Sequence, residues 1–100
     1  MRAEIFNFKG WIGETDTAKV KALMERMLSA SGFTVLDKVE HVFEPNGFTA
    51  VWILAESHLA VHSFPEENKT YIEISSCSRT KNEAFVNLID KLVIKAGPEI

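Results

Sequence analysis

The sequence predicts an α+β fold, specifically a two-layer sandwich in which an antiparallel β-sheet carries two helices on one face. The chain has 100 residues, the length of a single domain over 1–100, and 46% of them are apolar, enough to form a core. Apolar residues repeat at helical spacing in only two segments. The remaining segments are short, rich in β-branched and aromatic residues, and joined by connections of hairpin length, which favour antiparallel pairing.

The first half of the chain predicts a strand, a helix and a second strand. The opening strand lies around Ile5–Phe8, and Thr15 or Asp16 is expected to cap the helix that follows. Gly32 suits the position just past the end of this helix, because a left-handed backbone there favours glycine. Residues 33–35 and 39–43 then predict one strand or a bent pair. The apolar positions of the helix are Val20, Leu23, Met24, Met27 and Leu28.

The second half predicts three more strands and a closing helix. Glu44-Pro45-Asn46-Gly47 is a strong turn signal. Strands are expected over 48–55, 58–64 and 70–76, and the last of these alternates between two faces. A helix from Thr80 onward, closed by Gly97-Pro98, has its apolar positions at Ala84, Phe85, Leu88, Ile89, Leu92 and Val93.

The apolar strand over 48–55 also predicts how copies of the chain associate. Its continuous apolarity indicates that both of its faces are covered. Two helices on one side of the sheet cover only one of them. We therefore expect a twofold homodimer in which the two sheets pack face to face.

Composition excludes several classes of function. The net charge is −3 and the basic residues form no run, so we expect no nucleic-acid partner. The longest apolar stretch, 51–55, is too short to cross a bilayer, and the start shows no apolar leader, so we expect a cytoplasmic protein without membrane contact. A single cysteine makes no internal disulfide. No C-x-x-C or H-E-x-x-H pattern is present, so we expect no metal site.

Chemistry-bearing side chains gather in one segment, residues 56–77. It holds Ser57, His58, His62 and the only thiol, Cys77, which together can supply a nucleophile, a base and a proton donor. Taken singly, each has an ordinary role: a lone cysteine is usually a small buried apolar residue, and a histidine on a strand is usually structural or exposed. The joint pattern carries the functional argument.

That joint pattern resembles the prokaryotic S-adenosylmethionine decarboxylases, which are pyruvoyl-dependent enzymes. The resemblance rests on Phe43-Glu-Pro-Asn-Gly-Phe-Thr49, on Ala-Glu56-Ser57-His58 followed by His62 and Phe64-Pro-Glu66, and on Ser76-Cys77. It is close over residues 41–78 and looser over the rest of the chain. Ser78 departs from the family pattern, in which many relatives have glycine.

The resemblance implies a zymogen that cuts itself autocatalytically between Glu56 and Ser57, giving fragments 1–56 and 57–100. Ser57 would attack the Glu56 carbonyl, and elimination would leave a pyruvoyl group at position 57. By the same resemblance, His62 is the base for this processing. Thr49 supplies a hydroxyl that steadies the intermediate, where serine would serve equally.

The pyruvoyl group would then be the self-derived cofactor of a lyase, forming a Schiff base with the substrate amine as pyridoxal phosphate does elsewhere. The resemblance assigns reprotonation to Cys77, and a thiol with an ordinary pKa of about 8.5 suits a proton donor near neutral pH. It also implies stacking of adenine on Phe43, ribose hydroxyls on Glu66 and a second aromatic wall at Phe64. The implied reaction is decarboxylation of S-adenosylmethionine for polyamine (spermidine) biosynthesis.

The spacing of Ser57 and His62 adds a geometric argument. With a strand between them they lie on the order of 16 Å apart in one chain, beyond any hydrogen bond. No glycine or proline lies between them to fold the chain back. We therefore expect two shared sites in the homodimer, each with Ser57 and Cys77 from one protomer and Thr49 and His62 from its partner.

Two alternatives stay open at the level of sequence. The first is the same pyruvoyl chemistry on a bare amino acid such as arginine or ornithine, against which Phe43 and Glu66 argue. The second is an uncleaved, non-catalytic paralogue that binds a ligand or a partner subunit.

Overall fold

The computed structural model describes residues 3–95, and its elements follow the predicted β-α-β-β-β-β-α order. Short 3₁₀ segments, η1 and η2, follow β4 and α2. The bounds are β1 Phe6–Ile12, α1 Thr17–Ala30, β2 Val35–Val42, β3 Phe48–Leu54, β4 Ser57–Phe64, η1 Pro65–Glu67, β5 Lys69–Ser76, α2 Arg79–Ile89 and η2 Asp90–Leu92.

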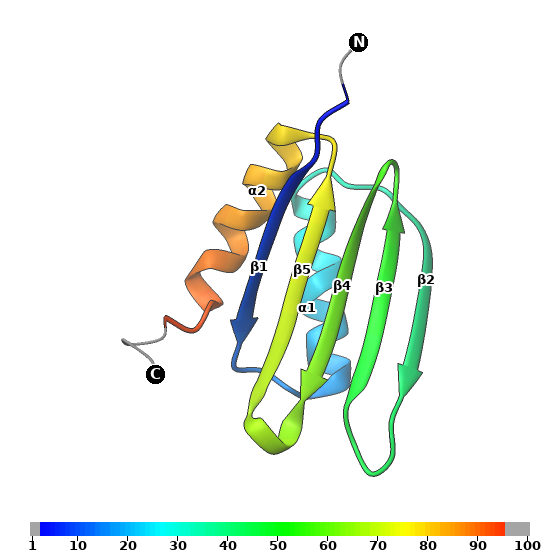
Figure 1. Ribbon diagram of the computed structural model, residues 1–100, viewed down its shortest axis with the longest axis vertical. Helices are drawn as coiled ribbons and strands as arrows, with labels where there is room; N and C mark the ends of the chain where they lie inside the picture. Colours follow the sequence, from blue (N-terminus) through cyan, green and yellow to red (C-terminus); the bar gives the residue numbers. More distant parts are fainter. Residues whose placement is uncertain (1–2, 96–100) are drawn as a thin grey trace.

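The five strands form one antiparallel sheet in the order β1-β5-β4-β3-β2. Both helices lie behind this sheet in Figure 1, on the same face, and the face toward the viewer carries no element. The predicted two-layer α+β sandwich is confirmed. We call the face without helices the open face.

The core lies between the sheet and the two helices. Alternate residues of the central strands point into it, as the two-residue period of a strand requires. The largest fully buried side chains include Trp52 and Phe48 from β3 and Phe85 from α2. The remaining ones are Ile12, Met24, Leu28, Leu54, Leu59, Ile72, Ile74, Ile89 and Val20.

Helix α1 begins and ends as the sequence predicts. The Asp16 side chain accepts a hydrogen bond from the Lys19 N–H at 3.0 Å and so caps the first turn. At the other end Gly32 has φ +88°. Its N–H donates to the Ser29 carbonyl, and the Phe33 N–H donates to the Leu28 carbonyl, which is a Schellman termination.

The edge strand β2 is continuous, with a shift in its pairing to β3 between Val35 and Asp37. The two predicted segments, 33–35 and 39–43, are therefore one strand with a local irregularity. It begins later than predicted because Phe33 is drawn into the core by the end of α1. All eight residues of β2 are exposed.

Helix α2 is shorter than its apolar pattern predicts. It ends at Ile89, and the chain tightens into η2 before Val93 pairs with Ile12 as an isolated β-bridge. The Ile94 N–H also donates to the Trp11 carbonyl at 2.8 Å. These bonds to the end of β1 draw the chain out of the helix. The predicted stop at Gly97-Pro98 lies outside the described residues.

On the open face, β3 presents Thr49, Val51 and Ile53, and Ile53 is 42% exposed. One chain therefore covers only one of the two faces of β3. The partner sheet predicted to cover the other remains a prediction. Among residues 3–95 no helix is long and apolar enough to cross a membrane.

Candidate active site

The candidate cleavage bond lies at the tight hairpin between β3 and β4. Leu54 pairs with Ser57 across this hairpin, so only Ala55 and Glu56 form the turn. Glu56 has φ +54°, in the left-handed region that favours glycine. For a residue with a side chain this conformation costs roughly 1–2 kcal/mol. The strained residue is the one whose carbonyl precedes Ser57.

Ser57 is the first residue of β4, and its side chain is directed toward the helix-covered face. Its Oγ donates a hydrogen bond to Ser76 Oγ at 3.0 Å. Ser76 is the cross-strand neighbour of Ser57 in the β4–β5 register and is fully buried. The hydroxyl of the candidate nucleophile is therefore held at the edge of the core.

Cys77 follows β5 directly and is exposed, so the ordinary expectation of a small buried residue is wrong for this cysteine. Its Sγ donates to Glu56 Oε1 at 3.4 Å. The hydrogen bond to this carboxylate raises the pKa of the Cys77 thiol, and the charge of Glu56 acts in the same direction. Glu56, Ser57 and Cys77 thus form one group at this end of the sheet.

A second group lies at the opposite end of β4. Thr49 and His62 are cross-strand neighbours on the open face, and Thr49 Oγ1 lies 2.9 Å from His62 Nδ1. The Tyr71 ring stacks on the imidazole, with centroids 6.0 Å apart and planes inclined by 23°. His62 is therefore held from two sides.

A surface cavity of about 610 Å³ adjoins this second group. Five of the candidate residues line it: Phe43, Thr49, His62, Phe64 and Glu66. Its wall is the β2–β3 turn, where Gly47 has φ +94° and approaches the Ser63 carbonyl so closely that a Cβ atom would lie 3.3 Å from that oxygen. Aromatic rings together with a carboxylate and an imidazole suit a ligand that has a flat ring and hydroxyl groups.

The two groups are separate within one chain. Strand β4 runs without interruption from Ser57 to Phe64, so Ser57 and His62 lie five positions apart along the strand, on the order of 16 Å. Their side chains also lie on opposite faces, because an odd number of steps along a strand reverses the direction of the side chain. Ser57 points toward the helix layer, and His62 lies on the open face with Thr49 and Tyr71.

The sequence assigned no role to three residues near the two groups. Ser76 accepts the Ser57 hydrogen bond, Tyr71 stacks on His62, and Ser63 Oγ accepts from the Phe48 N–H at 2.9 Å beside the cavity. The strand alternation places Ser76 on the buried face. Ser76 lies beside Ser57 because β5 pairs with β4, and this pairing is known only from the strand order of the sheet.

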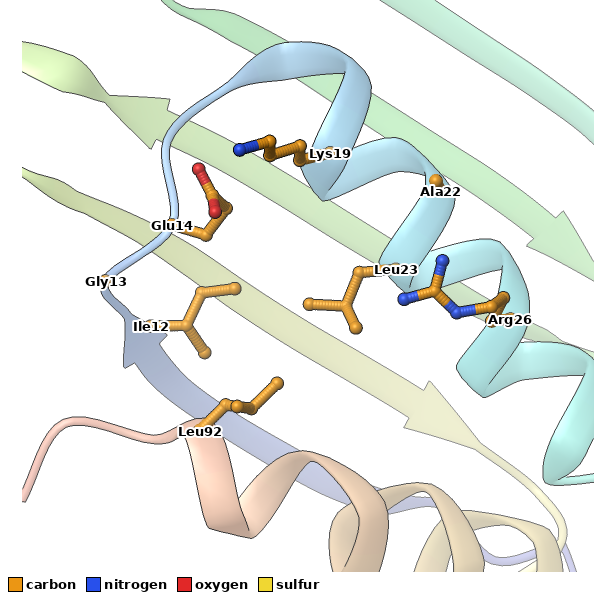
Figure 2. A pocket seen from close by; sticks show the side chains of 8 residues that line it. All are labelled: Ile12, Gly13, Glu14, Lys19, Ala22, Leu23, Arg26 and Leu92. Atoms are coloured by element: carbon orange, nitrogen blue, oxygen red, sulfur yellow. The ribbon is translucent and has the colours of Figure 1, made fainter.

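Another cavity, of about 420 Å³, lies on the helix side between the end of β1, α1 and η2. Figure 2 shows Ile12, Leu23 and Leu92 converging at its floor, with Lys19 and Arg26 along α1. None of the candidate residues lines it. The chemistry indicated by the sequence therefore lies at the ends of β4.

Fold and site together define a two-layer α+β domain whose reactive side chains gather around the two ends of one central strand. Residues 7–96 match the sequence model of the S-adenosylmethionine decarboxylase family. Because this match covers most of the chain, the chain belongs to that family.

Individual relatives agree with this assignment. The S-adenosylmethionine decarboxylase proenzyme of Prochlorococcus marinus (strain MIT 9313) is 34% identical over 62 residues, which cover 62% of this chain and 50% of the relative. That of Thermoplasma acidophilum is 31% identical over 78 residues, covering 76% and 60%. The chain spans about half the length of the curated relatives it matches.

A solved structure shows the same fold. The crystal structure of the adenosylmethionine decarboxylase from Aquifex aeolicus VF5 matches with a TM-score of 0.74 at 20% identity. The match covers 92% of this chain and 82% of that one.

Proposed function

We propose that this chain is a proenzyme that cuts itself between Glu56 and Ser57 and then decarboxylates S-adenosylmethionine, a reaction that supplies polyamine synthesis. The observation that carries the proposal is the coincidence of two findings at one bond. The family match covers this segment, and the strained left-handed residue Glu56 immediately precedes the candidate nucleophile. Relatives named as proenzymes support the self-processing part.

Self-cleavage begins with the Ser57 hydroxyl. Its Oγ attacks the Glu56 carbonyl carbon, the C–N bond to Ser57 breaks, and the hydroxyl proton ends on the released nitrogen. The product is an ester in place of an amide. This exchange is unfavourable in an unstrained peptide, and relief of the strain at Glu56 offsets part of the cost.

The second step removes the Cα proton of Ser57. Elimination then releases the new C-terminal carboxylate of Glu56 and leaves a dehydroalanine at position 57. Water hydrolyses its imine form, so the nitrogen leaves as ammonia and a pyruvoyl group remains. We assign the base to His62, held by Thr49 at 2.9 Å.

We further propose that His62 and Thr49 act on the Ser57 of a partner subunit. Within one chain the two groups lie at opposite ends of β4 and cannot meet. A twofold axis that lies between the two sheets and runs perpendicular to β4 would place each end of β4 opposite the other end of β4 in its copy. Two identical chains packed sheet to sheet would then form two complete sites.

The residues around position 57 suit the group that the cleavage would create. When present, a pyruvoyl ketone condenses with an amine and accepts the electrons released as carbon dioxide departs. Cys77 lies beside this position, exposed and with its pKa raised by Glu56. A thiol that stays protonated at neutral pH can deliver a proton, which is the role we propose for Cys77.

The substrate is proposed from the cavity beside His62. Phe43 and Phe64 offer flat apolar surfaces to an adenine ring, and Glu66 offers a carboxylate to ribose hydroxyls. A bare amino acid such as arginine or ornithine has no purine ring to stack on the two phenylalanines. The lining therefore favours the adenosyl compound over these alternatives.

The decisive experiment follows the purified full-length chain on a denaturing gel and by intact mass. We expect two fragments, 1–56 and 57–100, the second lacking the Ser57 nitrogen and reacting with a hydrazine reagent for ketones. Ser57→Ala should remain whole, whereas Glu83→Gln, on the exposed side of α2, should be cut as the original chain is. A wild-type chain that stays whole after long incubation would contradict the proposal and leave a binding role.

Release of carbon dioxide identifies the substrate. The processed protein should release it from carboxyl-labelled S-adenosylmethionine and not from arginine or ornithine. If carbon dioxide were released faster from arginine or ornithine than from S-adenosylmethionine, that amino acid would replace S-adenosylmethionine as the proposed substrate.

A further inference from the structure

The hydrogen bond between Ser57 and Ser76 has a direction that bears on the first step of cleavage. Ser57 Oγ is the donor and Ser76 Oγ the acceptor, at 3.0 Å. The lone pairs of Ser57 Oγ are therefore not engaged by Ser76. Among residues 3–95 Ser76 is the only hydrogen-bond partner of this hydroxyl. The proton that Ser57 must give up is therefore the one in the hydrogen bond to Ser76.

The Ser76 hydroxyl is itself fixed in place. The Ser78 N–H donates to Ser76 Oγ at 2.9 Å, and Ser76 Oγ lies 3.4 Å from the Ser78 carbonyl oxygen. Ser78 is also the N-cap of α2, and its Oγ accepts from the Lys81 N–H. Ser76 is fully buried, so water does not compete for its oxygen. The start of α2 thus anchors the hydroxyl that faces Ser57.

Among residues 3–95 no imidazole or carboxylate forms a hydrogen bond with Ser57 Oγ. His62 lies five residues along the same strand and on the opposite face of the sheet, bonded to Thr49. A serine side chain has three staggered rotamers, and the bond to Ser76 selects one of them. Selection of one rotamer fixes the position of the attacking oxygen relative to the Glu56–Ser57 bond.

We infer that Ser76 is a positioning residue for self-cleavage. Its buried hydroxyl holds Ser57 Oγ for attack on the Glu56 carbonyl. It accepts the hydrogen bond from the Ser57 hydroxyl until that proton passes to the released nitrogen. The inference rests on the proposed self-cleavage. Ser76 is unchanged at the end of the step. It acts in the acyl shift, whereas His62 acts in the later elimination.

The test measures cleavage of the full-length chain after a pulse of cell-free synthesis with a labelled amino acid. Ser76→Ala should slow the loss of the full-length band about tenfold or more, since an oriented hydroxyl contributes at least that much to a proton transfer. Ser76→Thr retains the hydroxyl and should restore most of the rate. Ser76→Cys keeps the side-chain volume but has a weak acceptor, and should remain slow.

A matched control separates positioning from stability. Thr70 lies on the same face of β5, is equally buried, and donates through Oγ1 to the Glu14 carbonyl at 2.6 Å. Thr70→Val removes a buried hydroxyl from the same strand without touching Ser57. We expect it to lower the thermal midpoint and leave the cleavage rate within about twofold.

Hydroxylamine, which cleaves esters, locates the affected step. It should leave Ser76→Ala slow, because little ester forms, and should cut His62→Ala quickly, because that variant stops at the ester. Wild-type cleavage rates in Ser76→Ala, or full recovery of that variant with hydroxylamine, would overturn the role of Ser76. Failure of the proposed function itself would instead appear as a wild-type chain that neither cuts nor responds to hydroxylamine.

Discussion

Cys77 is the only thiol of the chain, and the Glu56 carboxylate has the largest effect on its pKa. The thiol donates to Glu56 Oε1, so the neutral S–H form is favoured and the thiolate is opposed by the nearby negative charge. The side chain is exposed, so reagents reach it. The same glutamate precedes the candidate cleavage bond. The protonation of the Cys77 thiol is therefore linked to whether that bond is intact.

Substitution of Glu56 should therefore lower the pKa of Cys77. In an uncleavable Ser57→Ala background, Glu56→Gln removes the charge and converts the acceptor to a neutral amide. We expect iodoacetamide to alkylate Cys77 faster than in Ser57→Ala alone at pH values just below the wild-type pKa, because more thiolate is present there. The measurement is the alkylation rate as a function of pH, followed by intact mass.

Glu73→Gln in the same background is the control, because it removes a carboxylate that Cys77 does not contact. Its alkylation profile should coincide with that of Ser57→Ala. Identical profiles for Glu56→Gln and Ser57→Ala would show that Glu56 does not control the thiol.

The types and spacing of the candidate residues identified them in the sequence. They did not show toward which face of the sheet each side chain points. Strand alternation alone places Ser57 and His62 on opposite faces, since five steps separate them. Spacing therefore predicted that they do not meet, and alternation adds that each serves a different side of the sheet. The contact of Ser57 with Ser76 depends on β5 lying beside β4, and nothing local in either strand encodes that neighbour.

At the scale of elements, the edge strand β2 is held to α1 by charge and not by burial. Lys38 Nζ lies 3.1 Å from Glu25 Oε2, and Lys21 Nζ lies 2.9 Å from Glu40. The same Glu25 oxygen accepts from the fully buried Trp52 indole at 3.1 Å. Hydrogen bonds from Lys38 and then Trp52 lower the pKa of Glu25. This carboxylate links the helix, the edge strand and the core.

Glu25→Gln should accordingly destabilise the protein in a pH-dependent manner. The pKa of Glu25 is lower in the folded state than its ordinary value of 4.5, so its contribution is present above that pH and is lost as the pH falls through the folded-state pKa. Because the side chain is 47% exposed, solvent screening limits the loss to about 0.5–1 kcal/mol at pH 7. Urea unfolding of both proteins at pH 7 and at about pH 3 measures it.

The difference between the two proteins should shrink as the pH falls through the folded-state pKa of Glu25, because the protonated side chain resembles glutamine. Glu83→Gln, on the exposed side of α2, should change stability little at either pH. A Glu25→Gln deficit that is equal at both pH values would mean that the loss comes from packing and not from charge.

The elements themselves were largely predictable, and the deviations have local physical causes. Asp16 and Gly32 fix α1 through bonds that depend on residue type alone. The end of α2 was not predictable from its apolar period, because Val93 is drawn to Ile12 by a bridge to a strand far away in sequence. Local signals define where an element can form, and tertiary pairing decides where it stops.

At the scale of the molecule, the open face carries apolar side chains on β1, β2, β3 and β4. Val39, Ile53 and Phe64 are 65%, 42% and 39% exposed, and they lie among half-buried Val51, Ala60 and Trp11. Apolar side chains spread over several strands on one face mark a surface for a partner. On the helix side of the sheet, the buried apolar residues of the described chain form the core.

Shared sites make a prediction that no single-chain site can satisfy. A dimer of one Ser57→Ala chain and one His62→Ala chain contains one intact site, with Ser57 from the His62→Ala chain and His62 from its partner. The His62→Ala chain should therefore be cut when the two are coexpressed, although neither variant is cut alone. Different affinity tags identify the chain that gives the fragments, and copurification through one tag shows that the two chains associate.

The face that joins the chains supplies the control. Ala60 lies at the centre of the open face, on the strand that carries both groups, and Ala60→Asp would bury a charge in a sheet-to-sheet interface. Introduced into both variants, it should abolish copurification and complementation together while leaving the circular dichroism of each chain unchanged. Copurification without cutting of the His62→Ala chain would place His62 outside the Ser57 site of its partner. Cutting of either variant expressed alone would mean that one of the two side chains is dispensable for cleavage.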